Sequence, residues 1–238
     1  MKITSIPSLA CFGTLMLCAG NALALSPFAE KFAADPNSSR WGTSNFGSGE
    51  IAVSGGKLSF SVAKNPTRDD FATLTLKSPL PKVTEDWEVT VDVTNTSAKG
   101  NSSSPGLLIE NAADRNDAVF IEFYNNSPQS SQVGSIFMTN ENDDPDQDIG
   151  KSITGTKASL RASYKKSTKL ITLWYRTSSK VAWSKLANFS PFNDATAQRY
   201  GNWKMNATTG KFRVTIYGFA EKSVIPSGTI TLDNFSIR

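Results

Sequence analysis

Apolar and polar residues alternate with a period of two from about residue 50 to the end of the chain. In the first clear run, Leu58, Phe60 and Val62 alternate with serines, and in the third, Trp87 and the valines that follow alternate with polar residues. The runs lie at 58–62, 72–76, 87–93, 106–110, 118–126, 132–138, 159–164, 170–176, 211–219 and 230–238. Alternation of this kind is typical of β-strands with two different faces.

These runs follow one another at short spacing and no stretch has a convincing helical period, so the pattern predicts an all-β, antiparallel sandwich. Segments rich in Pro, Gly, Asn and Asp separate the runs, and we expect loops at 31–41, 99–105, 140–148 and 195–210. No repeat and no linker divides the chain. The sequence therefore predicts one domain, from residue 25 to residue 238.

The last run contains a break in its alternation. Ile230 and Leu232 lie two residues apart, but the next apolar pair, Phe235 and Ile237, has the opposite parity. A shift of one residue moves every later side chain to the other face of a strand, and a β-bulge absorbs such a shift. We therefore expect a bulge at Asp233–Asn234.

The N-terminal segment has the features of a cleaved signal peptide of bacterial type. Lys2 gives a positive start, an apolar run follows, and Ala22 and Ala24 supply the small residues before a cleavage site. We expect residues 1–24 to be removed and the protein to be secreted or periplasmic. Both cysteines, Cys11 and Cys18, lie in this segment, so the mature domain is expected to rely on its apolar core and to contain no disulfide.

Composition narrows the possible functions. The chain has no histidine, which removes the usual general base of serine and cysteine hydrolases and the commonest zinc ligand. The formal net charge is +4, and the basic residues are scattered among acidic ones, so no nucleic-acid-binding stripe is expected. No segment after the signal peptide is long and apolar enough for a membrane span.

Three stretches resemble the jelly roll of concanavalin A-like lectins and glucanases. They are residues 28–41 followed by 51–60, the hairpin-like segment 159–176, and 118–126 followed by 132–140. The third stretch is similar to the strand and following segment that carry the metal site of legume lectins. The resemblance implies a jelly-roll β-sandwich and a polysaccharide or other glycan as the ligand.

The chain departs from both branches of this superfamily. In the legume-lectin metal motif the strand Glu is followed two positions later by Asp and then by His, whereas here Glu122 is followed by Tyr124 and Gln132. A calcium and manganese pair is therefore not expected. The glucanase pattern Glu-x-Asp-x-x-Glu does not occur, and the nearest imitation is Asp86, Glu88 and Asp92 on one strand.

Two groups of carboxylates are candidates for chemical sites. Asp86 and Glu88 would lie about 6–7 Å apart on one strand, which glycosidases can use, but the strand is apolar on its other face and the acids most simply form its solvated side. The aspartate-rich loop 140–148 is likewise interpreted as a solvated loop. Glu122 differs because Phe120 and Tyr124 share its face, and a carboxylate on a covered face needs partners.

Possible partners for Glu122 come from the segment 159–176. Pairing of its two halves brings Arg161 and Ser163 near Thr172 and Trp174. Aromatic rings stack on sugar rings and charged planar groups bind paired hydroxyls. We therefore expect a ligand-binding surface that contains Glu122, Tyr124, Arg161, Trp174, Arg176 and Tyr217. The alternative, an ion pair and aromatic residues that only fill a curved sheet, stays open.

The leading hypothesis is a secreted, non-catalytic carbohydrate-binding protein that holds glycan on a concave sheet or at its rim, and no catalytic residue is assigned. The alternatives are a glycoside hydrolase or polysaccharide lyase, and a structural or adhesive module of the cell envelope. The resemblance also implies an optional structural calcium near the chain ends, with Asp233 and Glu30 as its ligands.

Overall fold

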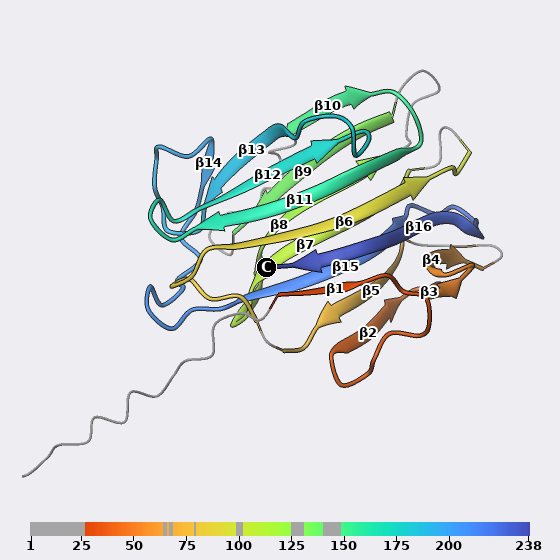
Figure 1. Cartoon of the computed structure of the whole chain (residues 1–238), viewed down its shortest axis with the longest axis horizontal. Coiled ribbons are helices and arrows are strands. Elements are labelled where there is room, and N and C mark those ends of the chain that lie inside the picture. Colours follow the sequence, from red (N-terminus) through yellow and green to blue (C-terminus); the bar gives the residue numbers. More distant parts are fainter. Residues whose placement is uncertain are drawn as a thin grey trace, which may run out of the picture.

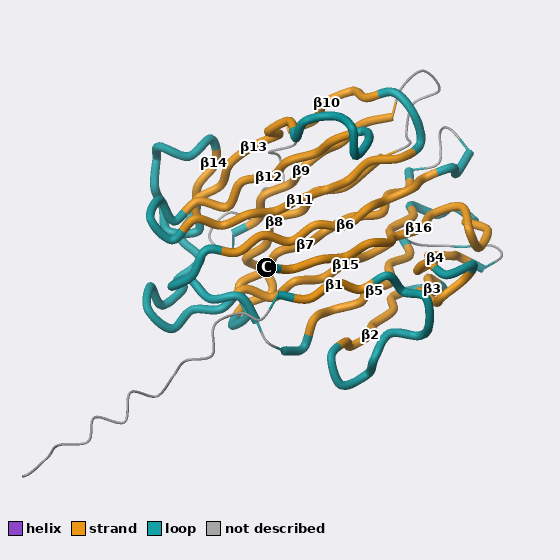
Figure 2. The backbone as a smooth tube through the Cα atoms, in the orientation of Figure 1, coloured by secondary structure: helices purple, strands orange, loops and turns teal. Residues whose placement is uncertain are grey.

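The computed structural model describes residues 27–63, 66, 69–78, 80–98, 102–124, 131–139 and 149–238. The predicted signal peptide and the acidic loop at 140–148 lie outside the described residues. The described part of the chain forms β-strands and loops and contains no helix (Figure 2). Accordingly, no helix with the length and apolar character of a membrane span occurs in it.

The strands make up two sheets, which we call sheet A and sheet B (Figure 1). The strands of sheet A are β1 (Phe28–Glu30), β3 (Gly49–Ser54), β4 (Lys57–Val62), β6 (Trp87–Asn95), β11 (Lys157–Lys165), β12 (Leu170–Arg176), β13 (Ser184–Ser190), β14 (Arg199–Tyr200) and β16 (Ile225–Ile237). The strands of sheet B are β2 (Trp41–Phe46), β5 (Asp70–Leu76), β7 (Ser103–Asn111), β8 (Asp114–Tyr124), β9 (Ser131–Met138), β10 (Ile149–Ile153) and β15 (Phe212–Ala220).

Sheet A has the order β14-β13-β12-β11-β6-β16-β4-β3, with β1 also paired to β16, and sheet B has the order β10-β9-β8-β7-β15-β5-β2. All neighbouring strands are antiparallel except the short β13–β14 pair. The final strands β15 and β16 lie in the middle of different sheets, and long connections link other neighbours. These features confirm the predicted all-β jelly-roll sandwich.

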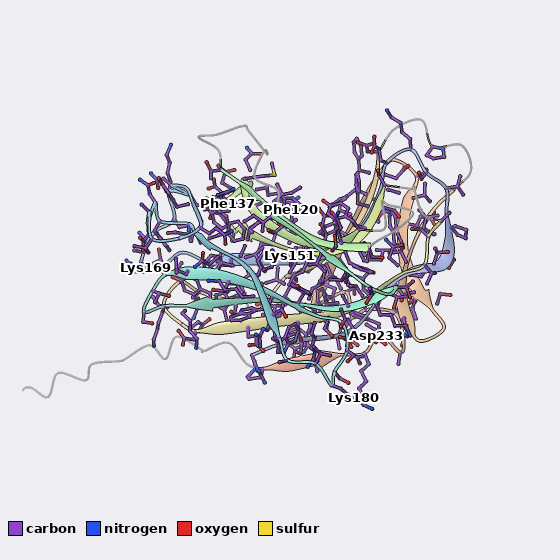
Figure 3. The ribbon with its side chains drawn as sticks, turned by 90° about the horizontal axis from the view of Figure 1, so that it is seen from above. Phe120, Phe137, Lys151, Lys169, Lys180 and Asp233 are labelled. Carbon is purple, nitrogen blue, oxygen red and sulfur yellow. The ribbon has the colours of Figure 1, made fainter. Side chains whose placement is uncertain are left out.

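The alternation in the sequence determines which side chains form the core between the sheets. On β6, Val89, Val91 and Val93 are buried, and on β8, Ile121 and Phe123 are buried in the same cluster. The intervening residues of both strands point away from the core. The outer face of sheet A and the outer face of sheet B are therefore on opposite sides of the molecule. Figure 3 shows this arrangement, with Phe120 of sheet B on the upper side and Asp233 of sheet A on the lower side.

Three of the predicted loops contain structured residues, and the segment 31–41 ends with Trp41, which begins β2 and is buried. In the segment 99–105, Ser103 to Pro105 belong to β7, where Ser103 pairs with Ala220 and its carbonyl accepts a hydrogen bond from Asn95 Nδ2 at 2.8 Å. In the segment 195–210, the side chain of Trp203 is fully buried. Polar composition predicted loops at these places, but tertiary contacts override the local pattern.

The predicted bulge in the last strand is confirmed. Asp233 lies opposite Asp92 and Ser236 lies opposite Thr90, so two residues of β16 face a single residue of β6. Asn234 takes up the extra position with a φ of 48°, and its Nδ2 donates to Asp92 Oδ2 at 2.9 Å. Phe235 consequently turns inward and is fully buried. The change of parity in the sequence is therefore explained by a bulge in the backbone.

The conformation of Asn234 gives a first prediction. A β-branched residue is strained at positive φ, whereas glycine is not. The variant Asn234→Val should therefore be less stable than Asn234→Gly by about 1–2 kcal/mol. Thermal unfolding of the two variants tests this, because both lose the bond to Asp92 and differ in backbone strain. Equal stability would show that the positive φ does not constrain this position.

Candidate functional site

A row of residues on the outer face of sheet B places two glycines beside Glu122. Gly134 of β9 and Gly106 of β7 lie opposite Glu122 of β8 on its two sides, and Tyr217 of β15 lies opposite Gly106. The row thus crosses four neighbouring strands. Residues at matching register positions point to the same face of a sheet, so these side chains share one surface.

The glycines make room for two tyrosine rings. A Cβ at Gly106 would lie 2.5 Å from the hydroxyl oxygen of Tyr217, and a Cβ at Gly134 would lie 2.8 Å from Cε2 of Tyr124. Both distances are too short for any side chain. The Tyr217 and Tyr124 rings therefore lie across the glycine positions, which brings their hydroxyl groups toward Glu122.

Three hydroxyl groups donate hydrogen bonds to the Glu122 carboxylate. Ser104 Oγ and Tyr217 Oη donate to Oε2 at 2.6 and 2.8 Å, and Tyr124 Oη donates to Oε1. Glu122 is 5% exposed, so these bonds compensate for the burial of its charge. Glu122 therefore fixes the position of the tyrosines, and its carboxylate is largely satisfied by the protein itself.

Tyr217 is held as a hydrogen-bond donor. Burial of its hydroxyl raises its pKa well above the ordinary value, and the neighbouring negative charge of Glu122 adds to this effect. Deprotonation would place a second negative charge beside the carboxylate in a buried position. Tyr217 is consequently unsuited to act as a general base near neutral pH.

An aromatic pocket of about 340 Å³ opens above this network. Besides the residues named above, it is lined by half-buried apolar side chains: Phe71, Phe120, Ile136 and Phe219. The ring of Phe71 lies 4.9 Å from that of Tyr217, and Phe120 meets Tyr217 edge-on at 6.0 Å. The aromatic pocket therefore combines ring faces and edges with fixed hydroxyl groups, an arrangement that suits a ligand with both apolar and polar faces.

A second hollow of about 510 Å³, which we call the polar hollow, lies next to the aromatic pocket and shares Phe71 with it. Its lining includes Glu110, Arg213 and Thr215. Arg213 Nη1 lies 3.9 Å from Glu110 Oε1, and Thr215 Oγ1 donates to Glu110 Oε2 at 3.4 Å. Burial raises the pKa of Glu110, and the positive charges of Arg213 and Arg115 offset part of that rise.

The remaining predicted residues lie on the outer face of sheet A. Arg161 pairs across the strands with Trp174, as expected, and Arg161 Nη1 lies 3.3 Å from Glu88 Oε2. The guanidinium carbon of Arg161 lies 4.7 Å from the Trp174 ring centre and 4.3 Å from that of Trp183, and Arg176 lies 4.5 Å from Trp183. The four side chains form a stack of alternating aromatic and cationic groups.

The structure thus divides the predicted surface into two. Glu122, Tyr124 and Tyr217 come together on sheet B, whereas Arg161, Trp174 and Arg176 lie on the opposite side of the sandwich. The expected pairing of Glu122 with the 159–176 hairpin is wrong, because Glu122 belongs to the other sheet and is satisfied by hydroxyl groups. Alternation predicted which side chains point outward but not which sheet contains each strand.

Several residues at the site were missed from the sequence. Phe71 and Phe219 line the aromatic pocket from strands that are distant in sequence. Ser104 donates to Glu122, and Gly106 and Gly134 make room for the tyrosine rings. Phe71 and Phe219 occupy outward positions of alternating runs, so their parity was a usable signal. Trp183 was missed because it precedes β13 in a segment without alternation.

Asp86 and Glu88, at the start of β6, form ion pairs on the outer face of sheet A. Asp86 accepts hydrogen bonds from Lys165 Nζ and from the backbone N–H of Lys166, both at 2.9 Å, and these interactions lower its pKa. Glu88 contacts Arg161 and also accepts a hydrogen bond from Arg238 Nη2 at 2.8 Å. This agrees with the interpretation of these acids as a polar strand face.

The residues do not fit a metal pair of the legume-lectin type. Hydroxyl groups donate to both oxygens of Glu122, and Tyr124 stands where the motif has a second carboxylate. Asp233 accepts from the N–H of Asn234 and lies 3.7 Å from Lys57 Nζ, while Glu30 accepts from the N–H of Phe32. Among the residues that the structure describes, no three acidic side chains gather as a cation site, and the calcium at Asp233 and Glu30 stays a prediction.

The two acids on the outer face of sheet B do not form a glycosidase pair. Glu110 and the residue opposite Glu122, Gly106, are four positions apart on β7. Four steps along a strand correspond to about 13 Å. Retaining glycosidases place their carboxyl groups about 5–5.5 Å apart and inverting enzymes about 6.5–9.5 Å apart. These two carboxylates are too far from each other for either mechanism.

The chain is similar to known proteins in its three-dimensional structure. No protein-family model matches the chain, and no curated protein matches its sequence. Among solved structures, lectin I-B4 from Griffonia simplicifolia in its metal-free form has a TM-score of 0.58 and 13% identity, over 90% of this chain and 99% of the lectin.

Two further structures are similar over most of their length. Lectin II from Ulex europaeus has a TM-score of 0.56 and 11% identity, over 89% of this chain and 97% of the lectin. The carbohydrate recognition domain of Emp46p, in its potassium-bound form, has a TM-score of 0.56 and 10% identity, over 87% of this chain and 93% of that domain. At these identities the likeness establishes the fold. The chain therefore has the concanavalin A-like jelly-roll fold.

Proposed function

We propose that this protein is a secreted, non-catalytic carbohydrate-binding protein and that it holds glycan on the outer face of sheet B. The aromatic pocket is the observation that carries the proposal. Phe71, Phe120 and Phe219 provide partly exposed apolar surfaces, and the tyrosine hydroxyls are fixed by Glu122. Sugar rings have apolar faces bordered by hydroxyl groups, so they match such a surface.

Two structures with this fold support the choice of ligand class. Lectin UEA-II is complexed with galactose, and winged bean acidic lectin is complexed with methyl-α-D-galactose. Fold alone does not establish function, and the proposal therefore rests on the pocket. Arg161, Trp174 and Arg176 lie on the opposite face and take no part in it.

The proposal predicts a specific effect of Phe120→Ala. Removing this half-buried ring takes away one wall of the aromatic pocket but leaves the core between the sheets intact. We expect glycan affinity to fall about tenfold or more, which corresponds to a loss of about 1.4 kcal/mol. Pull-down on insoluble polysaccharides and affinity electrophoresis in soluble ones measure the effect.

The matched control is Trp174→Ala, which removes an aromatic side chain from the opposite face. Its glycan affinity should equal that of the wild type, and thermal unfolding of both variants checks that each is folded. Failure of the wild-type protein to bind any polysaccharide or arrayed glycan would refute the proposed function. Unchanged binding by Phe120→Ala would exclude the aromatic pocket as its site.

A further inference from the structure

The polar hollow beside the aromatic pocket indicates what kind of glycan this face recognises. This inference rests on the proposed function and adds a chemical class to it. The hollow is lined by three cationic side chains, Lys77, Arg115 and Arg213, and by one carboxylate, that of Glu110. Three positive charges and one negative charge give a formal charge of +2. A hollow with a positive excess attracts anions.

Arg213 has hydrogen-bonding capacity that the protein does not use. Its Nη2 donates to the carbonyl oxygen of Ala112 at 3.0 Å. Its Nη1 is buried and has no hydrogen-bond partner, since the nearest oxygen of Glu110 is 3.9 Å away. A buried N–H without a partner is costly, and an oxyanion is a strong acceptor for a guanidinium group.

The other two cations are more accessible. Arg115 is exposed at the start of β8 and lies close enough to Glu110 to affect its titration. Lys77 Nζ donates to the carbonyl oxygen of Ser38 at 2.7 Å, which uses one of its three N–H groups. Both side chains therefore have donors left for a ligand.

Glu110 opposes an anion less than its formal charge implies. Burial raises the pKa of Glu110, so its negative charge is disfavoured in this position. The positive charges of Arg213 and Arg115 offset the negative charge that the carboxylate does carry. The remaining lining of the hollow is rich in hydroxyl groups that suit a polar sugar ring, from Thr43, Ser44, Thr73, Thr75 and Thr215.

The polar hollow and the aromatic pocket form one continuous surface. Alternate residues of β15 run from Arg213 and Thr215 in the hollow to Tyr217 and Phe219 in the pocket. Six steps along a strand correspond to about 20 Å. A chain of two or more linked sugar units is long enough to contact both regions along their full extent.

We propose that the glycan bound by this protein is an acidic oligosaccharide or polysaccharide. Its carboxylate or sulfate group binds Lys77, Arg115 and Arg213 in the polar hollow, and a neighbouring sugar ring packs in the aromatic pocket against Phe71 and Phe120. The binding requires at least two linked sugar units, because the anion site and the ring site lie at different ends of the surface.

Affinity electrophoresis with paired polysaccharides tests the proposal. Polygalacturonate and alginate supply carboxylates, dextran sulfate supplies sulfate, and galactan and dextran serve as neutral probes. We expect at least tenfold tighter binding to an acidic probe than to the neutral ones, and weaker binding as salt is raised. Preference for the uronates assigns the anion as a carboxylate, and preference for dextran sulfate assigns it as a sulfate.

Variants separate the two parts of the surface. Arg213→Gln and, at the exposed position, Arg115→Gln should each lower affinity for the acidic probe about tenfold and leave binding of neutral glycan unchanged. Phe120→Ala should weaken binding of both kinds of probe. Lys180→Gln removes a positive charge on the opposite side of the molecule (Figure 3) and should have no effect. Melting temperatures confirm that each variant is folded.

The outcomes distinguish this inference from the proposed function. Equal or tighter binding of neutral polysaccharides, or an acidic preference that survives both arginine substitutions, would overturn the acidic specificity and leave glycan binding intact. Equal losses in Arg115→Gln and Lys180→Gln would mean general charge attraction, which also contradicts the proposal. Absence of binding to every probe would refute the proposed function itself.

Discussion

Gly106→Ala should lower the free energy of unfolding by about 2 kcal/mol and abolish the ordered contact between Tyr217 and Glu122. The new Cβ would lie 2.5 Å from the Tyr217 hydroxyl oxygen, so the ring has to move. This movement is costly because the ring is fully buried against its neighbours. Overpacking of a buried site typically costs about 1–3 kcal/mol. Displacement of the hydroxyl also leaves Glu122 with one donor fewer.

The measurements are thermal unfolding and glycan affinity. A loss of about 2 kcal/mol corresponds to a melting temperature lower by about 4–8 °C in a domain of this size. Gly150→Ala is the matched control, because it lies on β10 of the same sheet and its new Cβ meets only Gln132 Oε1 at an ordinary 3.5 Å. Equal melting temperatures for the two variants would contradict the role assigned to Gly106.

Trp203→Ala should destabilise the domain more strongly, by about 3–5 kcal/mol. The Trp203 ring is fully buried and stacks on Phe137 at 5.7 Å, and its Nε1 donates to the carbonyl oxygen of Met138 at 3.1 Å. Its own carbonyl accepts from Asn111 Nδ2 at 2.8 Å. Removing the ring creates a cavity and also leaves the Met138 carbonyl oxygen without its hydrogen-bond donor.

Denaturant unfolding tests this prediction, with Tyr200→Ala as the control. Tyr200 is 49% exposed and lies three residues earlier, at the end of β14, so its truncation removes an aromatic ring without opening a cavity. The Trp203 variant should have a clearly lower midpoint than the Tyr200 variant. Similar midpoints would mean that the segment 201–210 packs too loosely to stabilise the domain.

Prediction from the sequence succeeded for the regular strands and failed for Trp203. Strands with strict alternation, such as β6 and β12, were predicted closely because burial of one face requires an apolar residue at every second position. Trp203 lies among Asn, Gly and Thr residues that predict a loop. The segment is indeed largely irregular, and its burial comes from tertiary packing that no local pattern records.

The candidate site was predicted in part for the same reason. The two apolar faces of the 118–124 segment correctly singled out Glu122 as a buried carboxylate that needs partners. Its true partners, Ser104 and Tyr217, come from β7 and β15, and only strand order places them beside β8. Strand order depends on long-range pairing, so alternation alone paired Glu122 with a hairpin that belongs to the other sheet.

A crystal structure of the protein with a bound oligosaccharide tests the central claim most directly. The ligand is chosen as a short fragment of the polysaccharide that binds most tightly in affinity electrophoresis. The account predicts a sugar ring in the aromatic pocket against Phe71 and Phe120, within reach of the Tyr124 hydroxyl. A sugar bound instead on sheet A, beside Arg161 and Trp174, or at a position away from both faces, would contradict it.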